Sequence, residues 1–71
     1  MKQSIIDELR VEILAQLKDI TPRSCPEIYN EIKTPQGYAN IERRIIAMVC
    51  ADGITPSGAI GQIESQLEGN G

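Results

Sequence analysis

The chain has 71 residues, which is enough for one domain and too few for two. Its formal charge at pH 7 is −3, and it contains two cysteines and no histidine. Without histidine or a CxxC pair, the usual zinc sites and covalent haem attachment are excluded, so we expect no metal and no cofactor. The negative charge also argues against a general nucleic-acid coat and against a polybasic membrane anchor.

Charge is distributed unevenly along the chain. Residues 23–44 hold four basic and three acidic residues, whereas residues 45–71 hold three acidic residues and no basic one. The middle of the chain is therefore the part best suited to approach a polyanion. The N-terminus lacks the apolar run of a signal peptide, and the longest apolar stretch is far shorter than the ~20 residues of a membrane span. These features predict a cytoplasmic protein with reduced thiols and no membrane partner.

The first predicted helix begins at Ser4 and ends before Pro22. Its start, residues 4–7, has the form of a capping box with aspartate in place of glutamate. One apolar stripe of an amphipathic helix follows, with Leu14 beside it. The members of the stripe are Ile6, Leu9, Ile13, Leu17 and Ile20. The residue before a proline avoids helical backbone angles, so Thr21 ends the helix.

The second predicted helix is short, about two turns. It starts with a capping box at Ser24-Cys25-Pro26-Glu27, in which the proline occupies the first turn. One apolar face is expected to pack in the core, so that Tyr29 is buried and the Cys25 thiol is a packing group. The members of this face are Cys25, Ile28, Tyr29 and Ile32.

A proline and a glycine punctuate residues 33–39, which are predicted to form a turn with Tyr38 exposed. The third predicted helix starts at about Tyr38 or Asn40 and runs to Ala51, with Asn40 as a candidate N-cap. Gly53 is the expected left-handed terminator. The inward stripe is Ile41, Ile45, Met48 and Val49, and Ile46 and Cys50 flank it at the core or its boundary.

The last segment has two predicted structures. Thr55-Pro56 is a suitable N-cap and first-turn pair, which favours a helix through Leu67. Two glycines in this stretch each cost a helix about 1 kcal/mol relative to alanine. A short hairpin at about residues 54–63 is the alternative. The apolar residues at helical spacing are Ala59, Ile60, Ile63 and Leu67.

The stretch from Ser24 to Ile54 resembles the helix-turn-helix of the winged-helix superfamily. Such domains show a polar cap, a short helix, a turn and a second helix that ends in a DGI-like step. The matching residues are Ser24, Glu27, Ile28 and Ile32, then Ile41, Ile45, Met48 and Asp52-Gly53-Ile54. The predicted turn is about three residues longer than the compact form, and no alternating, basic wing follows Gly53.

The predicted helices indicate an all-α, three- to four-helix domain with a helix-turn-helix core over residues 1–68, and a flexible tail over residues 69–71. If the segment at 54–63 forms a hairpin, the fold is instead a winged helix with a minimal β-hairpin. In both forms the helix that starts at Ser4 is the scaffold helix in front of the motif.

The resemblance also implies binding to double-stranded DNA. A recognition helix presents its first turns to base edges in the major groove, where arginine pairs with guanine, and asparagine or glutamine with adenine. The candidates for base contact are Gln36, Tyr38, Asn40, Glu42, Arg43 and Arg44. The candidates for phosphate contact are Arg23, Ser24, Lys33 and Thr34. About four phosphate contacts give a modest affinity, so we expect a homodimer or a helper protein.

The leading hypothesis is thus a small DNA-binding transcription regulator, of the kind that phages and mobile elements encode. In one alternative, Arg43 and Arg44 form a solvated helix face, paired with Glu42 or Asp52. In another, the same fold is a protein-interaction module, an adaptor or anti-regulator without nucleic-acid binding. Its partner would pack on apolar surface that the core leaves exposed at Ile5, Val11, Ile46 or Ile60. An enzyme is not expected, since no nucleophile–base pair or metal set is present.

Overall fold

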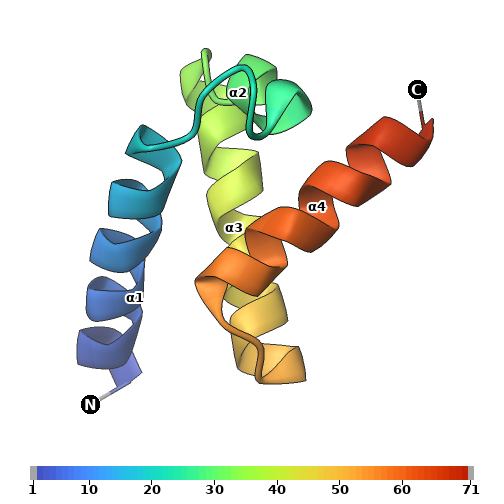
Figure 1. The fold of residues 1–71 in the computed structure, drawn as a ribbon. Helices are drawn as coiled ribbons and strands as arrows, with labels where there is room; N and C mark the ends of the chain where they lie inside the picture. Colours follow the sequence, from blue (N-terminus) through green and yellow to red (C-terminus); the bar gives the residue numbers. More distant parts are fainter. Residues whose placement is uncertain (1, 71) are drawn as a thin grey trace.

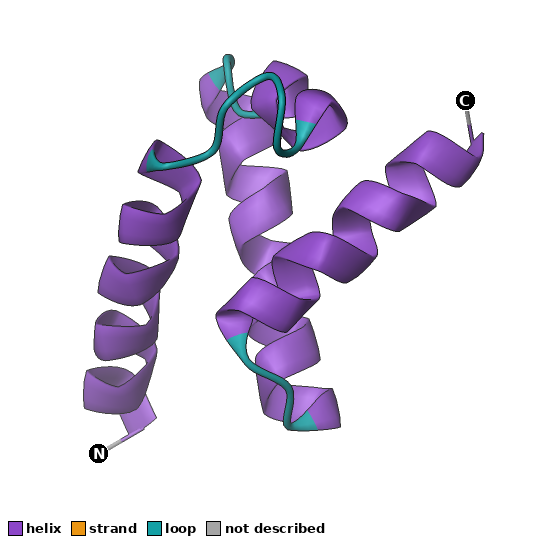
Figure 2. Cartoon of the chain, viewed as in Figure 1, coloured by secondary structure: helices purple, strands orange, loops and turns teal. Residues whose placement is uncertain are grey.

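The computed structural model describes residues 2–70 as four helices, with side chains described for residues 5–69 (Figure 1). The helices are α1 (Lys2–Lys18), α2 (Pro26–Glu31), α3 (Pro35–Asp52) and α4 (Pro56–Asn70). The described part of the chain contains no strand (Figure 2). The all-α prediction is therefore confirmed, and the alternative hairpin at residues 54–63 is wrong. No described helix is both long enough and apolar enough to cross a lipid bilayer.

Prolines and threonines mark the helix starts. A proline suits the first helical position, because its φ is already helical and its missing N–H has no partner to lose there. The Oγ1 atoms of Thr34 and Thr55 accept hydrogen bonds from the N–H groups of Gly37 and Gly58, at 3.1 Å each. Both threonines are N-caps, as predicted for Thr55. Gly53 follows α3 with a φ of 68°, which confirms the predicted left-handed terminator. The prolines at helix starts are Pro26, Pro35 and Pro56.

The predicted boundaries of α3 are wrong at its N-terminal end. α3 begins at Pro35, so Asn40 lies inside the helix and is not an N-cap. The predicted turn at residues 33–39 shrinks to a connection of residues 32–34. A proline is common both in turns and at the first position of a helix. Pro35 occupies the first position of α3. The expected departure from a compact helix-turn-helix connection is therefore also wrong.

A buried glycine permits this short connection. A Cβ atom at Gly37 would collide with the backbone carbonyl oxygen of Glu31. Only glycine lets the first turn of α3 approach the end of α2 so closely. The angle between α2 and α3 thus depends on residue 37 being a glycine, which has no side chain.

Two further predicted caps are wrong. α1 begins at Lys2, so Ser4 lies within the helix rather than at its cap. α2 has Cys25 at its N-cap position, without a side-chain capping bond. The Oγ of Ser24 instead accepts a hydrogen bond from the N–H of Thr21 at 3.0 Å, inside the α1–α2 loop. The local pattern identified polar residues near both helix starts, but it placed the starts incorrectly.

The N-terminus of α2 is capped from α4. The Glu64 side chain is only 6% exposed, and its two carboxylate oxygens accept the N–H groups of Glu27 and Ile28 at 3.1 and 3.0 Å. Carboxylates are stabilising at helix N-termini, and these two hydrogen bonds satisfy the buried charge. A side chain that is distant in sequence thus holds α2 against α4.

The core lies where α1, α3 and α4 meet under α2, and its residues come from all four predicted stripes. Cys25 is half-buried and packs against it, as expected, and burial and Glu64 raise the pKa of its thiol. Two expectations are wrong, because Cys50, expected at the core or its boundary, is exposed, and Ile60, expected to leave surface for a partner, is buried. The core residues are Ile13, Leu17, Ile28, Ile41, Ile45, Ala59, Ile60 and Ile63.

The two tyrosines differ from expectation. Tyr38, expected to be exposed in a turn, is half-buried in α3 and packs against the core. Burial, with Glu42 nearby, raises the pKa of its hydroxyl. Tyr29 is half-buried in α2, where the Nζ atom of Lys33 lies 5.3 Å from the centre of its ring.

The end of the chain is helical as far as Asn70. Gly71 lies outside the described residues, so the flexible tail over residues 69–71 stays a prediction.

Candidate nucleic-acid interface

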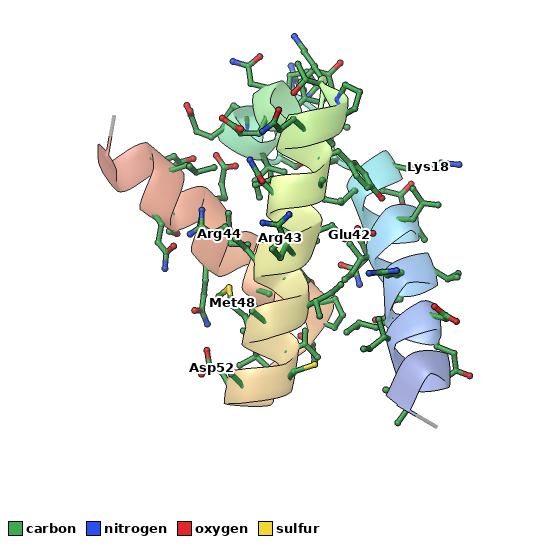
Figure 3. The ribbon with its side chains drawn as sticks, turned by 180° about the vertical axis from the view of Figure 1, so that it is seen from behind. Lys18, Glu42, Arg43, Arg44, Met48 and Asp52 are labelled. Carbon is green, nitrogen blue, oxygen red and sulfur yellow. The ribbon has the colours of Figure 1, made fainter. Side chains whose placement is uncertain are left out.

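One side of α3 faces solvent between α1 and α4 (Figure 3). No acidic residue is among the exposed residues from Pro35 to Cys50. Glu42 is half-buried on the side of α1, and Asp52 is exposed only at the C-terminal end. In a chain with a net charge of −3, this face is neutral or positive over most of its length. Its exposed members are Pro35, Gln36, Ala39, Asn40, Arg43, Arg44, Ala47 and Cys50.

Three of the predicted base-contacting residues lie together on this face. Gln36, Asn40 and Arg43 are separated by four and three residues, which places them one above the other on a helix. All three side chains are exposed, and none makes a hydrogen bond or ion pair with another described residue. Their polar groups are therefore available to a ligand that approaches α3.

Arg43 occupies a ridge between two surface hollows. One hollow lies between α3 and α4 and is also lined by Asn40 and Arg44, with the exposed Glu31 of α2 at its edge. The other lies between α1 and α3 and is also lined by Arg10 and Glu42. Arg43 lines both, and Figure 3 shows its side chain on the open side of α3. It is an exposed basic group that makes no hydrogen bond or ion pair with another described residue.

Arg44 is placed differently from its neighbour. Its Nη2 atom donates a hydrogen bond to Oε1 of Gln66 in α4, which links the two helices at the surface. Neither Arg43 nor Arg44 forms an ion pair with Glu42 or Asp52 among the described side chains. The alternative in which these acids pair with the two arginines on a solvated helix face therefore lacks the expected ion pairs. Arg44 is thus partly committed to the fold, whereas Arg43 is not.

The predicted phosphate-binding residues lie in the two loops at one end of the molecule (Figure 1). Arg23 is exposed in the α1–α2 loop, and Lys33 is exposed before α3. The side chains of Ser24 and Thr34 already make hydrogen bonds inside their own loops. Arg23 and Lys33 are therefore the members of this set with charge to offer a phosphate.

Sequence reasoning missed one basic residue near this face. Arg10 of α1 lines the same hollow as Arg43. The two are far apart along the chain, so only the packing of α1 against α3 brings them together. No local motif in the sequence signals this arrangement.

No family model matches the chain, and neither a curated protein nor a solved structure shows detectable similarity to it. The winged-helix resemblance therefore stays a prediction beyond the small, four-helix, all-α fold itself.

Proposed function

We propose that this chain is a small DNA-binding regulator in which α2 and α3 form a helix-turn-helix and α3 enters the major groove. The observation that carries the proposal is the outer face of α3, where Gln36, Asn40 and Arg43 are exposed and α3 itself has no exposed acid from Pro35 to Cys50. Asparagine and glutamine match the donor and acceptor pattern of adenine, and arginine matches that of guanine.

The arrangement of α2 supports this proposal. In helix-turn-helix proteins the first helix of the motif crosses the phosphate backbone while the second reads base edges. Here α2 is short, the connection to α3 spans only residues 32–34, and the carboxylate of Glu64 fixes the start of α2. A rigid α2–α3 pair holds α3 in one orientation relative to the rest of the domain.

The basic residues around α3 support a modest, salt-dependent affinity. Arg10 and Arg43 line one side of α3, while Arg23 and Lys33 lie at the end where α3 begins. Each phosphate contact lowers the logarithm of the binding constant by roughly 0.9 per decade of salt. With roughly four contacts we expect binding that is readily measured at low salt and largely lost at high salt.

An NMR titration with a short random-sequence DNA duplex at low salt tests the proposal. We expect amide shifts concentrated in residues 33–47, and we expect them to shrink as salt rises. Heparin is the matched control, because it carries anionic charge without a major groove. A folded protein that shows no shifts in α3, or the same shifts with heparin, contradicts the proposal and favours the interaction-module alternative.

A further inference from the structure

We propose that α3 prefers a short DNA sequence in which a G·C pair adjoins A·T pairs, with Arg43 bound to the guanine and with Gln36 and Asn40 bound to adenines. This preference rests on the proposed function, because only a chain that binds DNA through α3 can show it. The order of these three side chains along one exposed stripe of α3 carries the inference.

A narrow stripe of exposed side chains runs along α3, which we call the α3 stripe. Its members are separated by four, three, four and three residues. At 3.6 residues per turn, this spacing keeps them within roughly a quarter of the helix circumference. The buried Ile41 and Ile45 lie on the opposite side of α3. A DNA duplex that packs on the outer face therefore meets the α3 stripe first. The members of the α3 stripe are Gln36, Asn40, Arg43, Ala47 and Cys50.

Burial and an existing hydrogen bond disfavour the other predicted base-contacting residues. Tyr38 and Glu42 are half-buried. Arg44 lies beside the α3 stripe on the side of α4, where its guanidinium donates a hydrogen bond to Gln66 (Figure 3). Arg43 is therefore the arginine of α3 whose guanidinium can meet a base edge without losing a contact inside the domain.

The polar groups of the α3 stripe match two bases. Arginine forms two hydrogen bonds with O6 and N7 of guanine, whereas asparagine and glutamine form two with N6 and N7 of adenine. Gln36, Asn40 and Arg43 make no hydrogen bond or ion pair with another described residue, so a base edge has no internal partner to displace. A carboxylate would accept the N4 group of cytosine, but α3 exposes no acid between residues 35 and 50. The α3 stripe therefore selects purine edges.

The spacing along α3 sets the length of the preferred sequence. At a rise of about 1.5 Å per residue, Gln36 and Arg43 are roughly 10 Å apart along the helix axis. Stacked base pairs are about 3.4 Å apart, so a helix that follows the groove covers about three base-pair steps between these residues. Asn40 is closer to Arg43 than to Gln36, which places an A·T pair next to the G·C pair. Ala47 follows on the α3 stripe, and its methyl group suits contact with a thymine methyl.

Selection by the full chain from a pool of duplexes with a random central segment, at low salt, tests this preference. The enriched duplexes should share a G·C pair that adjoins A·T pairs. Exchanging that G·C pair for an A·T pair should weaken binding roughly 5- to 150-fold, measured by fluorescence anisotropy. Arg43→Ala should remove the preference at the G·C pair alone, and Asn40→Ala the preference at the adjoining A·T pair alone.

Arg23→Gln is the matched control. Arg23 is exposed in the α1–α2 loop, outside the α3 stripe. Its charge can contact phosphate but no base, so the variant should weaken binding to every duplex by the same factor and leave the preferred sequence unchanged. Circular dichroism of each variant verifies that it remains folded.

Replacement of the guanine by 7-deazaguanine tests the contact of Arg43 directly, because it removes the N7 acceptor and keeps the base pair. The replacement should weaken binding of the original chain and leave binding of Arg43→Ala unchanged. The inference is overturned if the chain binds all duplexes equally, if the enriched sequence lacks a G·C pair beside A·T pairs, or if Arg43→Ala keeps its preference at the G·C pair. In those cases the proposed function stands, whereas a folded chain that binds no duplex contradicts both.

Discussion

The α2–α4 contact and the outer face of α3 place charged side chains in opposite surroundings. In the contact, the Glu64 carboxylate is almost fully buried, and both of its oxygens accept backbone N–H groups. On α3, Arg43 is exposed and has no partner among the described side chains. The buried charge is explained by the fold alone, since without it the first N–H groups of α2 would lose their acceptors. The exposed charge makes no hydrogen bond or ion pair with another described residue, so it is open to solvent or to a ligand.

The same contrast separates two adjacent residues of α3. Arg44 donates a hydrogen bond to Gln66 and so links α3 to α4, while Arg43 does not. Two arginines that look equivalent in the sequence therefore have different surroundings. Substitutions at these positions and at Glu64 distinguish structural charge from charge that is available for binding.

The largest expected effect is on stability, from Glu64→Ala. The variant leaves the N–H groups of Glu27 and Ile28 without their acceptor, and Ile28 is fully buried. We expect a loss of about 1–3 kcal/mol in the free energy of unfolding, measured by urea denaturation. Glu64→Gln should lose less, because an amide oxygen still accepts a hydrogen bond but carries no charge. An unchanged urea midpoint for Glu64→Ala would show that the cap does not stabilise α2.

The next effect is on DNA affinity, from Arg43→Ala compared with Arg44→Ala. If Arg43 contacts a base or phosphate, its removal should weaken binding by about 1–3 kcal/mol while stability stays within about 0.5 kcal/mol. Arg44→Ala should weaken binding less and lower stability slightly, because it removes the link to Gln66. Fluorescence anisotropy with labelled duplex and urea denaturation measure the two quantities. Equal losses of affinity would remove the distinction between the two arginines.

The helices and the core were predictable from the sequence because they depend on local periodicity. The buried residues Ile13, Ile28, Ile45 and Ile63, one from each helix, all lie on stripes that three- and four-residue spacing identifies. Helix boundaries were less predictable. Pro35, for example, is compatible with a turn and with the first position of a helix. Only the structure shows that it begins α3, whose first turn can approach α2 because residue 37 is glycine.

Contacts between distant parts of the chain could not be predicted in this way. The bonds from the N–H groups of Glu27 and Ile28 to Glu64 cross 37 and 36 positions. The hydrogen bond of Arg44 to Gln66 crosses 22 positions. No local pattern indicates which carboxylate or amide will meet which helix end. For the candidate interface, the polar residues of α3 were identified from the sequence, but the placement of Arg10 and the burial of Tyr38 required the packed structure.

The smallest expected effect concerns the exposed rim of the α2–α4 contact. A hydrogen bond with Glu64, together with some desolvation and the charges of Glu64 and Glu27, raises the pKa of the Glu68 carboxyl group. A carboxyl group with a raised pKa in the folded state favours folding when protonated, and this contribution is lost as pH rises through that pKa. Ionised Glu68 therefore repels its neighbours at neutral pH.

Glu68→Gln tests this, because the amide resembles the protonated acid and carries no charge. We expect the variant to have a slightly higher urea midpoint than the original chain at pH 7. The two should converge at about pH 3, well below the ordinary glutamate pKa of about 4.3, because Glu68 is then protonated in both the folded and unfolded states. Glu8→Gln is the matched control, since Glu8 is an exposed glutamate on α1 and should not show this pH-dependent gain. A gain for Glu68→Gln that is the same at both pH values would contradict a protonation effect. It would indicate instead that the amide packs better against α2, so the pH dependence alone separates charge repulsion from packing at this contact.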